Sequence, residues 1–266
     1  MNNSTASRWG LRTLGLGYLA LLLLAPLVLI FFKTFEDGLA PPIDAITSPD
    51  GLHALKLTLL MVAVSVPINT IFGVGCALLL VRHRWKGNPV IDAIINLPFA
   101  ISPIVIGLSL FLLYGTDGWF GPTLADAGIK ILFSVPGMIL ASIFVSLPFV
   151  VRETVPVLQE IGTDQEQAAT TLGANARQTF LRITLPAIRW GVAYGVVLTT
   201  ARVLGEFGAV TIVSGSINGQ TQTLPLFVEK QYANFNQAGA YGASLVLALL
   251  ALATLLAMNL LKRKEA

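Results

Sequence analysis

Arg202 and Glu206 lie four residues apart in a largely apolar stretch of the chain. This spacing puts both side chains on one face of a helix, where they can pair. Ionised side chains inside a membrane cost about 2.5 to 3.5 kcal/mol on insertion scales and usually face a protein interior or a cavity. Two interpretations follow. A structural ion pair locking the helix to its neighbours is favoured; the other is a gate in which Arg202 donates to an oxyanion that Glu206 holds or repels.

Residues for covalent or metal chemistry are not grouped in this sequence. His53 and His83 flank a predicted membrane segment, Cys76 is the single cysteine, and no Gly-rich phosphate-binding loop ending in Lys and Ser or Thr is present. We therefore expect no enzyme active site, no ATPase site, no intrachain disulfide, and no cofactor or metal held by this chain.

A polar loop between two apolar segments carries a spaced motif. Gln167-Ala168-Ala169 is followed after three residues by Gly173, and after nine more by Ile183-Thr184-Leu185-Pro186. The sequence predicts a short helix over 162–172, capped by Thr163 or Asp164 and ended by Gly173 in a left-handed conformation. A second helix is predicted to run toward Ile183.

This motif resembles the cytoplasmic loop of bacterial ABC import permeases, whose pattern is Glu-Ala-Ala, three residues, Gly, nine residues, Ile, one residue, Leu-Pro. Both spacings match, but Gln167 stands where the family has Glu, and Glu166 lies one position earlier. In that family the loop docks on a separate ATP-hydrolysing subunit. The alternative is an amphipathic helix on the membrane surface. The resemblance predicts an ATPase contact made by Glu166, Gln167, Ala168, Ala169, Leu172, Gly173 and Ala174.

The composition of the chain is that of a membrane protein. Hydrophobic residues make up 55% and charged residues 12%, whereas soluble domains carry roughly 25% charged residues. A spanning helix needs about 20 apolar residues. We predict an all-α fold, a single membrane domain over 1–266 with a cytoplasmic loop at about 152–189. Its six transmembrane helices are expected at about 13–32, 56–81, 90–114, 133–151, 187–213 and 239–261.

The basic residues orient these six segments, because Lys and Arg are retained on the cytoplasmic side. Four of the 17 lie in the opposite loops, and Arg202 falls inside a segment. Both termini and the motif loop are thus predicted to be cytoplasmic.

The first segment is longer than a signal-peptide core of about 7 to 15 residues, so we expect a retained helix. No basic cluster indicates nucleic acid. The twelve basic residues on the cytoplasmic side are Arg8, Arg12, Arg82, Arg84, Lys86, Arg152, Arg177, Arg182, Arg189, Lys262, Arg263 and Lys264.

Further resemblance narrows the transported substrate. Gly205-Glu206-Phe207-Gly208 resembles a stretch of oxyanion permeases for sulfate and molybdate, and 213–229 is similar to the W-type membrane subunits of sulfate/thiosulfate importers, as are 96–103 and 148–153. The resemblance implies the type I importer permease fold and the bacterial inner membrane. It also implies a homologous T-type permease, two copies of an ATPase that bind ATP and Mg²⁺, and a periplasmic sulfate-binding protein as partners.

Polar side chains after the fifth segment are candidates for the outward mouth of a transport path, although each could equally shape an ordered loop. A sparse polar path suits a dianion, which many cations would trap. The candidates are Ser214, Thr221 and Thr223, with Ser216, Asn218 and Gln222 beside them. Two alternatives stay open: a molybdate or tungstate permease, and an autonomous ion-coupled carrier or channel that transports without an ATPase.

Overall fold

The computed structural model describes residues 5–36, 38–83 and 86–263. Within these ranges every regular element is helical, which confirms the all-α class. The elements are α1 (Thr5–Phe35), α2 (Ala40–Thr47), α3 (Pro49–Arg82), α4 (Asn88–Ala100), α5 (Pro103–Tyr114), α6 (Gly121–Asp126), α7 (Val135–Ile161), α8 (Asp164–Thr171), α9 (Ala176–Thr179), the π-helical turn η1 (Phe180–Thr184), α10 (Leu185–Leu204), α11 (Gly208–Ser214), α12 (Leu224–Ala233) and α13 (Gln237–Arg263).

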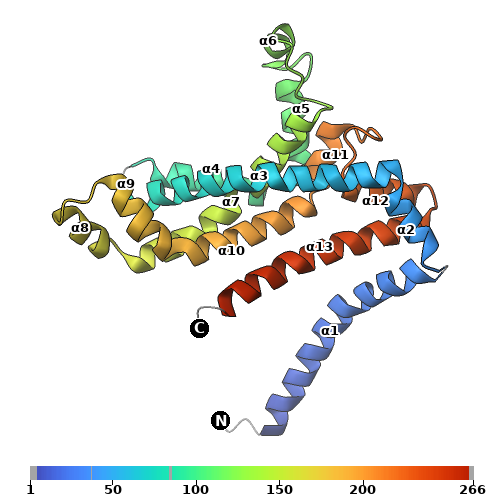
Figure 1. Ribbon diagram of the computed structural model, residues 1–266, viewed down its shortest axis with the longest axis horizontal. Coiled ribbons are helices and arrows are strands. Elements are labelled where there is room, and N and C mark those ends of the chain that lie inside the picture. The colour runs from blue at the N-terminus through green and yellow to red at the C-terminus, as the bar shows by residue number, and fades with distance from the viewer. Residues whose placement is uncertain (1–4, 37, 84–85, 264–266) are drawn as a thin grey trace.

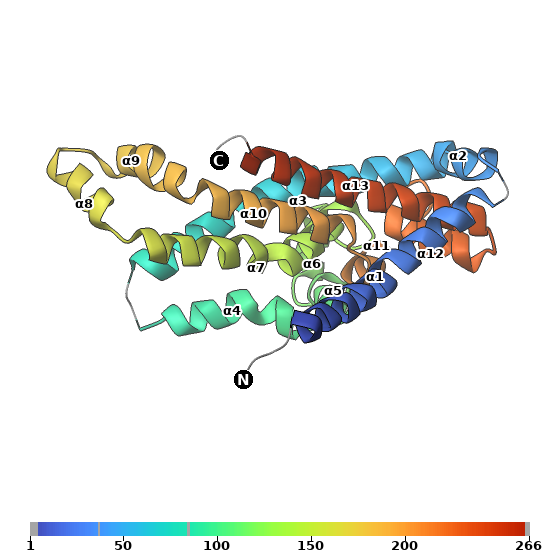
Figure 2. The same cartoon turned by 90° about the horizontal axis from the view of Figure 1, so that it is seen from below.

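An elongated bundle forms the body of the protein. Helices α3, α7, α10 and α13 run along its length, while α1 slants away and packs on α13 (Figures 1 and 2). The loop helices α8 and α9 lie at one end, and α2 and α12 at the other (Figure 1). The N-terminal end of α1 and the C-terminal end of α13 point toward the end that carries α8 and α9 (Figure 1). This agrees with termini and motif loop on one side of the membrane.

Close helix contacts hold the bundle together at Val150 of α7, which is fully buried. A Cβ atom on Gly73 of α3 would lie 2.6 Å from the Val150 Cβ, and one on Gly195 of α10 would lie 2.7 Å from its Cα. Glycine at both positions lets the three backbones approach. Asn69 adds a polar link, since its Nδ2 donates to Ser146 Oγ at 2.7 Å.

The third predicted segment, 90–114, is not one straight helix. Among the described residues five helices are long and apolar enough to span a membrane, and α4 with α5, bent by 111° at the break between them, makes a sixth if the pair is one span. Pro103 has no N–H to continue the ladder of α4, and Ser102 before it is extended with ψ 138°. As a result α5 and α6 project sideways from the bundle (Figure 1).

The fifth predicted segment, 187–213, has wrong boundaries. The membrane helix begins earlier, because α9, η1 and α10 form one apolar run over Ala176–Leu204. It also ends earlier, because Gly205 to Phe207 separate α10 from the short helix α11. Glu206 therefore lies beyond the end of the helix that carries Arg202, which corrects the expectation that one helix holds both.

The two breaks in the spans lie against each other. A Cβ on Gly208, at the start of α11, would be 3.0 Å from the Pro103 Cβ at the start of α5. One turn on, a Cβ on Gly107 would be 2.8 Å from the Ala209 oxygen. Helices α5 and α11 are thus packed backbone to backbone, and Phe133 N donates to Val213 O at 2.7 Å beside them.

Candidate functional site

The cytoplasmic loop folds as the predicted short helix, turn and second helix. Gly173 has φ +87°, the left-handed conformation expected of it, and the Ala174 N–H donates to the Ala169 oxygen at 3.0 Å. The predicted cap is wrong. Thr163 occupies the cap position of α8 but makes no capping hydrogen bond, and its Oγ1 instead accepts from Gln167 Nε2 at 3.0 Å. The second helix, α9, starts at a capping box between Asn175 and Gln178, an Asn-x-x-Gln signal that sequence reasoning missed.

Glu166 is turned toward its own chain. Arg82 Nε donates to Oε2 at 2.9 Å, Arg82 Nη2 donates to Oε1 at 3.1 Å, and Thr184 Oγ1 donates to Oε1 at 2.8 Å. The Arg82 side chain is only 12% exposed and the Glu166 side chain 20%. A bidentate pair of this kind is among the strong hydrogen-bonded contacts in proteins.

Arg82 also bonds to the end of α7. Its Nη1 donates to the Leu158 oxygen at 3.0 Å, and its Nη2 donates to the Gly162 oxygen at 2.8 Å. One side chain from the last turn of α3 therefore joins four segments: α3, α7, α8 and, through Glu166 and Thr184, η1. We call Arg82, Glu166 and Thr184 the Arg82 latch.

The other predicted contact residues form the outer surface of the loop. Gln167, Ala168 and Gly173 are exposed, Ala169 and Ala174 are half-buried, and Leu172 is 89% exposed. The surface of the loop that faces away from the bundle thus consists of small side chains and one highly exposed leucine. Glu166 is bound by Arg82 and so does not point to this surface. Gln167, which stands where the pattern of ABC import permeases has Glu, is exposed there instead.

Substitution at Gly173 separates backbone strain from close approach of a partner. No atom lies within 4 Å of a Cβ built there, so the chain itself leaves room. Valine disfavours positive φ by about 1–2 kcal/mol, whereas asparagine tolerates it. If this loop contacts an ATPase subunit, as its resemblance to import permeases implies, Gly173→Asn is expected to keep thermal stability but to lower uptake per ATP hydrolysed about tenfold, and Gly173→Val to lower both. Normal uptake by Gly173→Asn would show that nothing approaches this surface closely.

The ion pair between Arg202 and Glu206 forms despite the break. Arg202 Nη1 lies 2.7 Å from Glu206 Oε2, with the side chains 28% and 2% exposed. The other carboxylate oxygen, Oε1, accepts from the Ala209 N–H at 2.9 Å. Glu206 thus joins the end of α10 to the first turn of α11, an arrangement that supports the structural interpretation of the pair.

Ser214, Thr221 and Thr223, the candidates for the outward mouth, are buried within their own chain. Thr221 Oγ1 donates to the Ser214 oxygen at 2.6 Å and accepts from the Ile217 N–H at 3.2 Å. Ser214 Oγ accepts from the Ser216 N–H at 3.1 Å. The hydrogen bonds of Ser214 and Thr221 stay within the segment that joins α11 to α12, as an ordered loop requires. The role of Ser214, Thr221 and Thr223 in a transport path stays a prediction.

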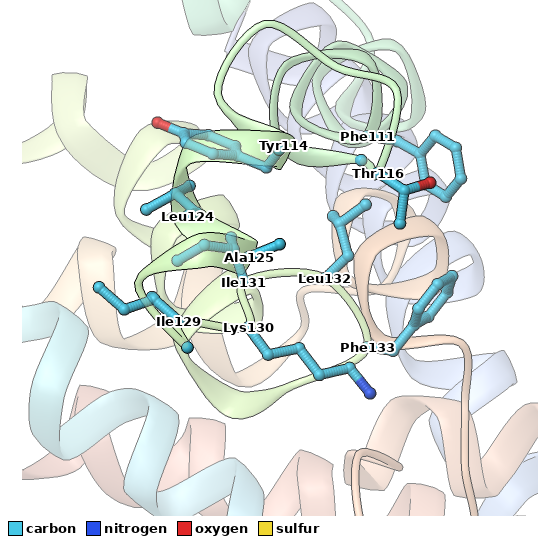
Figure 3. Close-up of a pocket in the computed structure, with 13 residues that line it drawn as sticks. Phe111, Tyr114, Thr116, Leu124, Ala125, Ile129, Lys130, Ile131, Leu132 and Phe133 are labelled. Carbon is cyan, nitrogen blue, oxygen red and sulfur yellow. The ribbon is translucent and has the colours of Figure 1, made fainter.

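A hollow of about 450 Å³ is bordered by the end of α5, by α6 and by the loop that follows α6 (Figure 3). Its lining is mostly apolar, including Phe111, Leu124 and Leu132, and Lys130 supplies a charge. It contains none of the predicted site residues.

Comparisons with known proteins agree with this geometry. Residues 69–265 match the family described as "Binding-protein-dependent transport system inner membrane component". The chain is 51% identical over 251 residues to the "Sulfate transport system permease protein CysW" of Synechocystis sp., covering 94% of this chain and 91% of the relative. It is 36% identical over 256 residues to the "Sulfate transport system permease protein CysT" of Salmonella typhimurium, covering 95% and 92%.

Among solved structures, a bacterial ABC transporter involved in the import of the acidic polysaccharide alginate is similar with a TM-score of 0.80. The match covers 97% of this chain and 95% of that one at 18% identity. At this identity the likeness bears on the fold, and it supports the importer-permease architecture.

Proposed function

Since this chain belongs to the family of binding-protein-dependent transport system inner membrane components, we propose that it is the W-type permease subunit of an ATP-driven importer of sulfate or thiosulfate. The higher identity to a CysW protein than to a CysT protein, 51% against 36%, favours the W-type subunit over the T-type. The site of action is a bacterial inner membrane, which the apolar spans fit.

The Arg82 latch is the observation that carries this proposal. A separate ATPase has to move the membrane helices through a small contact, and the latch links the exposed surface of α8 to the ends of α3 and α7. Thr184 extends the link to η1, which continues directly into α10. Closure of two ATPase subunits would thus displace three membrane helices together and shift the balance between inward-facing and outward-facing states.

The proposed assembly contains four kinds of protein. A homologous T-type permease pairs with this chain, two ATPase copies bind ATP and Mg²⁺ beneath the pair, and a periplasmic sulfate-binding protein delivers the anion. The similarity to CysT proteins supports two permeases of one fold. In addition, α1 packs mainly on α13 and its apolar side chains are largely exposed, which leaves apolar surface for lipid or for the second permease.

Reconstitution in liposomes tests the proposal. We expect labelled sulfate to accumulate only when both permeases, the ATPase, the loaded binding protein and ATP are present. Binding proteins loaded with molybdate or tungstate should stimulate ATP hydrolysis less than those loaded with sulfate. Sulfate transport by this chain alone would identify an autonomous carrier or channel, and stimulation restricted to molybdate would identify a molybdate permease.

A further inference from the structure

A hollow of about 250 Å³ with a mixed polar and apolar lining lies between α4 and α7, away from the latch and from the breaks. Arg152 is nine residues before the cytoplasmic end of α7, and Asn96 is eight residues after the cytoplasmic start of α4. At a rise of 1.5 Å per residue both lie about 12 to 14 Å along their helices from that end. The hollow is lined by Asp92, Asn96, Val151, Arg152, Val155 and Pro156.

The guanidinium group of Arg152 is held in place by two neighbours. Its Nε donates to Asn96 Oδ1 at 2.7 Å, and its Cζ lies 5.6 Å from the centre of the Phe99 ring. Phe99 in turn packs edge-on against Phe149 at 5.2 Å. The two terminal nitrogens of Arg152 make no hydrogen bond to any residue that the structure describes. Arg152 is exposed, so a positioned fork of N–H donors is available at the hollow.

The surroundings of this fork indicate a cavity or a partner and not lipid. Helix α4 has two exposed sides of different character. Val90, Ile94 and Leu97, which are 61%, 61% and 43% exposed, form an apolar side suited to lipid. Asp92 and Asn96 lie about 200° around the helix from Val90 and Ile94 respectively, at 100° per residue, on the side of Arg152. Because charged side chains in spanning helices face a cavity or a partner, the side of α4 that carries Asp92 and Asn96 is suited to a cavity or a partner and not to lipid.

We propose that Arg152, positioned by Asn96 and Phe99, is an anion contact on the cytoplasmic half of the transport path and takes a tetrahedral oxyanion dianion. This proposal rests on the proposed function and names a residue that the fold and the latch do not explain. A planar guanidinium matches the spacing of oxyanion oxygens and binds them in a bidentate manner. Asp92 lines the same hollow, and its negative charge repels a bound dianion and shortens its residence time. Transport requires this, because an anion that binds too tightly at any contact cannot move on.

Uptake by the reconstituted complex tests the charge. Loss of a charge-assisted contact should lower sulfate uptake about tenfold to a hundredfold in Arg152→Gln, with Arg152→Lys retaining a larger share. Lys86→Gln, which removes an exposed cation from the same side of the membrane, serves as the matched control and should leave uptake unchanged. Normal uptake in Arg152→Gln would overturn the proposal, as would failure of this variant to assemble with the second permease, which would assign Arg152 to the subunit interface.

A thiol placed in the hollow reports the anion directly. Cys76 is the single cysteine of the chain, so Val155→Cys in a Cys76→Ser background gives one reactive position on the wall of the hollow. In the assembled complex we expect a sulfonate-bearing thiol reagent to react several-fold faster than an ammonium-bearing one, and sulfate to slow it. The preference should vanish when Arg152→Gln is added. Equal rates that sulfate does not change would overturn the proposal, whereas failure of the unmodified complex to import sulfate would overturn the proposed function itself.

Discussion

Arg82→Ala is expected to separate ATP hydrolysis from uptake. Breaking a buried ion pair by removing one partner costs about 3–5 kcal/mol, and the partial exposure of this pair reduces that to about 2–3 kcal/mol. The same change also frees the oxygens of Leu158 and Gly162. A loss of 2–3 kcal/mol shifts the position of α8 relative to the bundle about 30-fold to 150-fold. The ATPase subunits would still bind α8, but its motion would no longer reach α3 and α7.

Parallel measurement of ATP hydrolysis and sulfate uptake in the same vesicles checks this result. The ratio of anions imported to ATP hydrolysed should fall by an order of magnitude or more in Arg82→Ala and in Glu166→Ala. The double variant should be little worse than either single one, because both remove the same pair. Arg182→Ala, an exposed arginine in the same loop, is the control and should keep the ratio. A normal ratio in Arg82→Ala would mean that coupling bypasses the latch.

Arg202→Gln is expected to destabilise the subunit strongly, since it leaves the carboxylate of Glu206 buried at 2% exposure without a cation. The expected cost is about 3–5 kcal/mol. Glu206→Gln should be milder, because an amide oxygen can still accept from the Ala209 N–H and the freed cation, Arg202, is 28% exposed. The double variant Arg202→Gln with Glu206→Gln should regain much of the lost stability.

The double variant also separates the two interpretations of this pair. Thermal unfolding in detergent measures stability, and uptake measures transport. If the pair is structural, the double variant should be stable and should transport normally. If Arg202 contacts the anion, the double variant should be stable but should transport poorly. Arg202→Gln as stable as the unmodified protein would contradict the structural role that the distances support.

The spans could be predicted because each depends on a local property, a run of about 20 apolar residues. Their interruptions were only partly predictable. Pro103 stops α4 through its missing N–H, but the 111° bend also requires that α5 find a surface on α11. The break after Leu204 has a local signal in the glycines Gly205 and Gly208, which the apolar character of the flanking residues obscured.

Contacts between distant parts of the chain could not be predicted. The partner of Glu166 is 84 residues away, and nothing near Glu166 indicates that Arg82 would reach it. Sequence reasoning therefore left Glu166 and Gln167 equally eligible for a partner contact. The short helices α2, α6 and α12 were also missed, although each carries Pro in its first turn, a usual sign of a helix start.

The contact between the two breaks limits how α5 and α11 can move relative to each other. Since Gly208 lies against Pro103 and Gly107 against Ala209, pulling α5 away from α11 would break a backbone-to-backbone contact. Rotation about 101–102 and 205–207 preserves that contact. Helices α5 and α11, which belong to two different spans, are therefore expected to move together as one unit.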